Sequence, residues 1–182
     1  MKSIVLFISL VAFTNCVAQK DYLKEMVYDL KNVEQMPEGR EYLADSAYWM
    51  VVKQKINIVP YLIGALIDTT ETKAYVPYVG GKFTIADIAY EALGNIIHGL
   101  PTLEMAEDSL YAEERNGYWG YWNYVRRSYD NRKKFKNRVE KWFDENKENL
   151  EWISYPPHPT DGKPTPFSHL EGYYRVKGSN VW

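Results

Sequence analysis

Cysteine is almost absent from this sequence: its 182 residues include one, Cys16. A single cysteine cannot form an intrachain disulfide, so the fold must be stabilised by a hydrophobic core, which a chain of this length can build. Histidine is also scarce, with three in the chain. No two of them have the helical spacing of a metalloprotease site, and no cysteines complete a structural zinc site. We therefore expect no metal and no cofactor; a metal held by His158 and His169 is the alternative.

Several other features of known function classes are missing. No apolar run of about 18 residues follows the N-terminal segment, so we expect no transmembrane span. The net charge of −2 argues against a nucleic-acid-binding protein, which is typically strongly basic. The chain lacks a nucleophile elbow of the Gly-x-Ser-x-Gly type and a Gly-rich loop for phosphate. We therefore expect no catalytic residues.

The N-terminal segment has the layout of a secretory signal peptide. Lys2 precedes an apolar stretch, Ile4–Phe13, and small residues up to Ala18 come before Gln19. The stretch is too short for a bilayer, which needs about 20 apolar residues. We expect residues 1–18 to be removed and the protein to be exported, either periplasmic or secreted. Export without disulfides is typical of a bacterial envelope protein.

Cys16 allows a second interpretation of the same segment. Bacterial lipoproteins acylate a cysteine at the cleavage point, after a leucine-like residue and a small residue in their motif. Here the preceding residues are Phe13-Thr14-Asn15, and Asn15 departs from that motif. We expect soluble export, with a lipid anchor at Cys16 as the alternative.

Hydrophobic periodicity after Gln19 predicts a mainly α fold: a compact multi-helix domain over residues 19–154. Apolar residues recur at helical spacing in five segments, near 21–30, 40–53, 57–68, 84–98 and 130–148. Asn57 and Asp130 are the expected caps of the third and fifth helices. Residues 155–182, which contain Pro, Gly and His, are predicted to pack on the same domain as an irregular tail or as a short hairpin through Tyr173, Tyr174 and Val176.

A β-hairpin-like excursion is expected between the third and fourth helices. Thr, Tyr and Val residues surround Gly80-Gly81 between Thr69 and Lys82. Thr84 and Asp87 then have the spacing of a capping box, which predicts the start of the fourth helix. This is the best-defined helix in the sequence.

The helices at 57–68 and 84–98 resemble one HEAT-type antiparallel helical hairpin. The sequence VPYLIGALID, residues 59–68, resembles the first helix of such a repeat, and AYEALGNI, residues 89–96, resembles the second. The chain departs from the family in its long connection and in having no further detectable repeat, whereas about three are needed for a solenoid. The resemblance implies a binding scaffold without catalytic residues of its own.

An aromatic and basic segment supplies the candidate binding residues. Tyr118, Tyr121, Trp122 and Val125 share a helical face, which indicates a buried stripe, whereas Trp119 lies off that stripe. Arg126 and Arg127 follow and begin a run of cations that could hold an anion, although acidic residues later in the same helix favour an ordinary solvated face. The candidate ligand or partner residues are therefore Trp119, Trp122, Arg126 and Arg127.

These features predict an exported, non-catalytic binding or scaffold protein of the cell envelope. Its binding surface would combine the excursion at 69–82 with the aromatic and basic segment. The partner would be another envelope protein or an anionic glycan. The alternative is a glycan-active enzyme with a carboxylate pair and an aromatic subsite.

Overall fold

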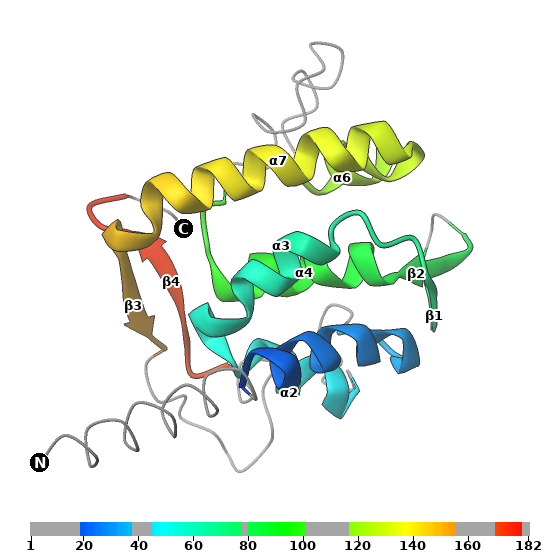
Figure 1. Ribbon diagram of the computed structural model, residues 1–182, viewed down its shortest axis with the longest axis horizontal. Helices are drawn as coiled ribbons and strands as arrows, with labels where there is room; N and C mark the ends of the chain where they lie inside the picture. Colours follow the sequence, from blue (N-terminus) through cyan, green and yellow to red (C-terminus); the bar gives the residue numbers. More distant parts are fainter. Residues whose placement is uncertain (1–18, 38–44, 78–79, 101–116, 156–169, 180–182) are drawn as a thin grey trace, which may run out of the picture.

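The computed structural model describes residues 19–37, 45–77, 80–100, 117–155 and 170–179. These residues form a mainly helical fold with two short strand pairs (Figure 1). Residues 19–28 are helical and lead into a 3-10 turn, η1. The elements of the first half are η1 (Asp29–Asn32), α2 (Ser46–Val52), η2 (Lys55–Ile58), α3 (Val59–Ala65), β1 (Glu71–Tyr75), β2 (Lys82–Thr84) and α4 (Ile85–Ile96). The second half contains α6 (Gly117–Asn123), η3 (Val125–Arg127), α7 (Tyr129–Asn146), η4 (Lys147–Asn149), β3 (Leu150–Ser154) and β4 (Gly172–Val176).

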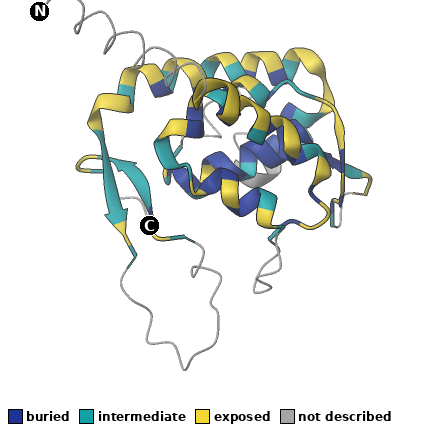
Figure 2. Ribbon diagram, turned by 60° about the horizontal axis from the view of Figure 1, so that its bottom comes forward, coloured by how far each residue is buried: buried dark blue, intermediate teal, exposed yellow. Residues whose placement is uncertain are grey.

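Helix α4 is the centre of the fold. The predicted capping box is confirmed: the Thr84 hydroxyl accepts a hydrogen bond from the Asp87 backbone, and the Asp87 carboxylate accepts one from the Thr84 backbone. Most residues of α4 are buried on several sides of the helix, as expected of a helix surrounded by other elements (Figure 2).

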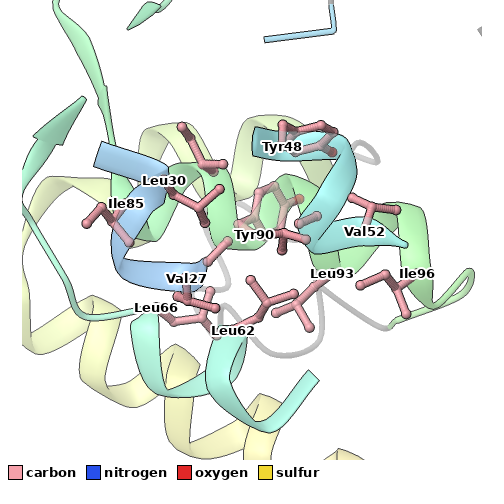
Figure 3. Packing of buried hydrophobic residues seen from close by; sticks show 14 of the residues in the cluster. Val27, Leu30, Tyr48, Val52, Leu62, Leu66, Ile85, Tyr90, Leu93 and Ile96 are labelled. Atoms are coloured by element: carbon pink, nitrogen blue, oxygen red, sulfur yellow. The ribbon is translucent and has the colours of Figure 1, made fainter. Parts of the chain in front are cut away.

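The other helices pack around α4 in layers. Helices α2 and α3 both contact α4, and α7 contacts α3, so that Figure 1 shows α7 and α2 on opposite sides of the central pair. Helix α3 runs antiparallel to α4, because the backbone of Asp68 just after α3 accepts a hydrogen bond from Ala86 at the start of α4. Together with η1 and α2 they form an apolar core that includes Leu30, Tyr48, Leu62, Leu66 and Leu93 (Figure 3).

Both strand pairs are antiparallel and lie at opposite ends of the helical layers (Figure 1). Strands β1 and β2 form the expected excursion, with Glu71 opposite Thr84 and Tyr75 opposite Lys82. Strand β3 pairs with β4 from Leu150–Val176 to Ser154–Gly172. The predicted C-terminal tail therefore contains one regular strand, β4, whose partner β3 lies before the tail, at the end of the segment predicted as the helical domain.

Two of the predicted helix caps are wrong. Asn57 lies inside η2, and α3 begins at Val59 without a side-chain cap, with Pro60 in its first turn. Helix α7 begins two residues earlier than expected, because the Ser128 hydroxyl accepts from the Asn131 backbone and caps it. In both places a competing local signal, a 3-10 turn or a serine, sets the boundary.

Several predicted features lie outside the described residues. They are the signal segment 1–18 with Cys16, and the two histidines His158 and His169. None of the helices that the structure describes is long and apolar enough to cross a membrane.

Candidate functional site

A buried ion cluster joins the start of α4 to α6, η3 and α7. One oxygen of Asp87 accepts from the Tyr121 hydroxyl at 2.9 Å and from Arg132 at 2.9 Å. The other oxygen accepts from Arg126 at 3.0 Å and from the Thr84 backbone at 2.8 Å. Asp87 is fully buried, and its charge is met by two guanidinium groups and two neutral donors.

The charges of this cluster determine how its groups titrate. Burial alone would raise the pKa of Asp87, but Arg132, the Thr84 N–H and Arg126 together outweigh it and hold that pKa below its ordinary value. Burial, followed by the charge of Asp87, raises the pKa of Tyr121 well above 10.0. The Asp87 carboxylate therefore stays ionised. We call this cluster of Asp87, Tyr121, Arg126 and Arg132 a structural joint, because it connects helices and does not transfer a proton.

The structure places two of the four predicted binding residues in or beside this joint. Trp122 is buried, with its ring edge-on to Phe83 and to Tyr121. Arg126 donates to Asp87 and also, at 2.6 Å, to the backbone oxygen of Lys82.

Arg126 therefore ties the excursion to the aromatic and basic segment, and the two regions predicted to form one surface do meet. Arg127 is exposed on η3. Trp119 belongs to α6, but its side chain lies outside the described part of the chain.

A pocket that sequence reasoning missed lies at the opposite end of α4. It has a volume of about 260 Å³ and is lined by residues from α2, η2, α4, β3 and β4 and from the segments beside them: Val52, Lys53, Lys55, Asn95, Ile96, Trp152, Leu170, Glu171 and Gly172. We call it the Trp152 pocket. Its lining combines an aromatic wall, two ammonium groups, one amide and one carboxylate, the composition of a site for a small polar ligand.

Lys55 contacts two other residues of the Trp152 pocket. Its Nζ lies 2.7 Å from Glu171 and 4.4 Å from the centroid of the Trp152 ring, which fits a cation–π contact. Among the described residues it is the one non-glycine with positive φ, at 57°. A lysine in this left-handed region is uncommon, since its Cβ crowds the backbone there.

Strand β4 approaches Trp152 closely because residue 172 is glycine. A Cβ at that position would lie 2.1 Å from the Ile153 carbonyl oxygen and 2.8 Å from Cζ2 of Trp152. Trp152 is further fixed by Tyr174, whose ring lies edge-on at 4.9 Å, and by a hydrogen bond that its Nε1 donates to Ser154. The aromatic wall of the pocket is therefore held in place before any ligand arrives.

A polar stripe on α4 links the buried ion cluster to the Trp152 pocket. Asp87, Glu91 and Asn95 are spaced four residues apart, so they lie along one face of the helix. The Asn95 amide nitrogen donates to the Tyr48 hydroxyl, and Asn95 also lines the pocket. Burial, followed by the nearby charge of Asp87, raises the pKa of Glu91 to about 7.

The third histidine belongs to an aromatic cluster on the β3–β4 pair. His98 stacks on Tyr173 with ring centroids 3.9 Å apart, and its Nε2 lies 3.4 Å from the Tyr155 hydroxyl. Its partial burial lowers the pKa of the imidazole. Within the described ranges no three metal-ligating side chains come together, and the ring contacts of His98 are with Tyr155 and Tyr173.

Sequence signals for the Trp152 pocket were weak. Leu150, Trp152 and Ser154 share one face of an alternating segment, which could have indicated a strand that presents an indole. Lys55, Asn95 and Glu171 carry no local motif, because they meet only through tertiary contacts between segments far apart in the chain. No family model, curated protein or solved structure matches this chain.

Proposed function

We propose that this chain is an exported binding protein of the cell envelope, without catalytic activity, whose Trp152 pocket takes one unit of an anionic glycan. The observation that carries the proposal is the pocket lining: Lys53 and Lys55 face a single carboxylate, Glu171, beside an indole and an amide. Ammonium groups attract an anionic substituent, while the Asn95 carbonyl can accept from a sugar hydroxyl.

The size of the pocket favours a small group over a protein surface. Its volume of about 260 Å³ lies just below the range of about 300–1,000 Å³ that is usual for pockets holding drug-sized ligands. One sugar unit at the end of a longer chain is of this scale. A protein partner would instead need a broad surface, for which Arg127 and the excursion at 69–82 remain the candidates.

Two features support binding over glycan hydrolysis. The one carboxylate among the pocket's lining residues is Glu171, whereas hydrolysis needs a carboxylate pair flanking the bond. The nearest pair on α4 consists of Asp87 and Glu91, and Asp87 is already engaged by two arginines. Its charge is therefore not available to a substrate.

Binding is tested by calorimetric titration of the full chain, expressed with its own N-terminal segment and recovered from the envelope fraction. The titrants are glucuronate and short glucuronate-containing oligosaccharides. We expect saturable binding that weakens at least roughly fivefold in Trp152→Phe, because the indole wall loses area. Trp142→Phe, a half-buried indole on α7 outside the pocket lining, is the matched control. Absence of binding to any acidic sugar would refute the proposal.

Export is tested on the same material. N-terminal sequencing that begins at Gln19 supports removal of residues 1–18 as a signal peptide. A mature chain that begins at an acylated Cys16, seen by intact mass, would instead support the lipid anchor. An intact Met1 in the cytoplasm would contradict export altogether.

A further inference from the structure

The ion pair between Lys55 and Glu171 joins two of the residues that line the Trp152 pocket. Lys55 stands on η2 and Glu171 directly precedes β4, so the pair joins two segments that are far apart in the chain. The distance of 2.7 Å from Nζ to Oε2 is that of a charge-assisted hydrogen bond. Lys55 at the pocket is therefore already paired with one carboxylate, supplied by the protein itself.

The two partners of this pair are held very differently. Lys55 has a second contact besides Glu171, since its Nζ lies over the Trp152 ring, and its side chain is 39% exposed. The Glu171 side chain is 73% exposed, and among the described residues Lys55 is its hydrogen-bond partner. We therefore expect that, when the pair opens, water solvates Glu171 while the cation–π contact of Lys55 with Trp152 remains.

The charge balance at the pocket also favours an incoming anion. Lys53 lies in the lining with Lys55, and both cations lower the pKa of Glu171, the hydrogen bond from Lys55 having the largest effect. Two cations face one carboxylate, so the lining has a net positive charge. A second carboxylate would make the pocket neutral rather than negative. Exposed ion pairs of this kind contribute little to folding stability, so their exchange for another carboxylate is not opposed by the fold.

Building on the proposed function, we propose that Glu171 is an internal competitor: it occupies the carboxylate subsite of the Trp152 pocket and is displaced when a sugar carboxylate pairs with Lys55. The ligand class is thereby narrowed to uronic acids and other sugars that carry a carboxylate. Lys53 would assist as a second cation, and the Asn95 carbonyl would accept from a ring hydroxyl.

The test compares two sugars that differ at one carbon, glucuronate and glucose, on three variants of the full chain. Glu171→Gln removes the competing charge, and we expect it to bind glucuronate roughly three- to tenfold more tightly, with no gain for glucose. Lys55→Gln should lose glucuronate binding by roughly tenfold or more. Lys73→Gln is the control. Lys73 forms an exposed ion pair with Glu34 at 2.8 Å outside the pocket lining, so its loss should change the affinity for neither glucuronate nor glucose.

The outcomes separate this inference from the proposed function. If wild-type protein binds glucuronate but Glu171→Gln binds it no more tightly, the competitor role is wrong and the binding function stands. If glucose binds as well as glucuronate, the carboxylate subsite is wrong while sugar binding stands. If neither sugar nor any acidic oligosaccharide binds, both proposals fail. Glu171 is exposed, so we expect its variant to fold, and circular dichroism checks this. The loss of glucuronate affinity in Lys55→Gln tests the carboxylate subsite independently of Glu171.

Discussion

Arg132 on α7 donates to Asp87 on α4 at 2.9 Å, and the side chains of both are almost completely shielded from water. Removing one partner of such a pair leaves an uncompensated buried charge, which is more destabilising than the pair is stabilising. The free energy of unfolding should therefore be sensitive to any substitution that removes the charge of Asp87.

We expect Asp87→Asn to destabilise the protein by about 3–5 kcal/mol, because two arginines lose their counter-charge and the capping carboxylate is lost. Urea denaturation followed by circular dichroism measures the change. Glu34→Gln, which breaks the exposed pair with Lys73, should cost less than about 1 kcal/mol. Equal effects of the two substitutions would show that the cluster is not a structural joint.

Glu91 predicts a pH dependence of stability with a definite sign. Its pKa is about 7 in the folded protein against an ordinary 4.5, so the folded state holds the proton more tightly than the unfolded state. Its contribution to stability is complete below about pH 4.5 and is lost as the pH rises through 7.

Glu91→Gln should therefore stabilise the protein at pH 8 by on the order of 2–3 kcal/mol and change little at pH 5. Urea midpoints at the two pH values measure this. Glu148→Gln, at an exposed site on η4, should stay within about 0.5 kcal/mol at both. A stabilisation that is the same at pH 5 and pH 8 would argue against titration of Glu91.

Gly172 and Gly94 predict opposite effects of the same change. Gly172→Ala forces a Cβ against the Ile153 carbonyl and the Trp152 ring, and we expect a loss of about 1–3 kcal/mol with weakened pairing of β3 and β4. Gly94 lies on the exposed side of α4 with no atom within 4 Å of an added Cβ, so Gly94→Ala should gain about 0.5–1 kcal/mol. Thermal melts of the two variants test the pair, and a stable Gly172→Ala protein would contradict the close approach.

Lys55 offers a test that separates backbone from charge. Lys55→Gly relieves the left-handed conformation and removes the ammonium group, whereas Lys55→Gln removes the charge alone. We expect Lys55→Gly to be more stable than Lys55→Gln by about 1 kcal/mol, while both lose glucuronate binding. Hydrogen exchange at η2 and calorimetry would measure the two effects, and equal stability would mean that the φ of 57° carries no strain.

The sequence predicted those parts of the fold whose causes are local. Thr84 and Asp87 stand three residues apart, and their capping box could be recognised from spacing alone. The arginines that neutralise Asp87 could not, because Arg126 and Arg132 reach it from distant elements. Trp122 could be assigned to a buried stripe from helical spacing, and it is buried.

The Trp152 pocket could not be predicted for a related reason. Lys55, Asn95, Trp152 and Glu171 belong to four separate segments, and no spacing relates them. The closest signal was Trp152 itself, in a segment whose alternation fits a strand. The resemblance to a HEAT-type hairpin stays a prediction, although α3 and α4 do pack antiparallel.

The position of β4 in the chain also determines when the pocket can form. Gly172 and Glu171 are made after nearly all of the helical framework, and β4 is anchored to it through the Tyr174 carbonyl, which accepts from the backbone of His98. The helices can therefore bury much of the core before β4 docks and completes the Trp152 pocket. Binding at the proposed site would then depend on the docking of β4, so a chain with an intact helical core but an undocked C-terminal strand would not bind.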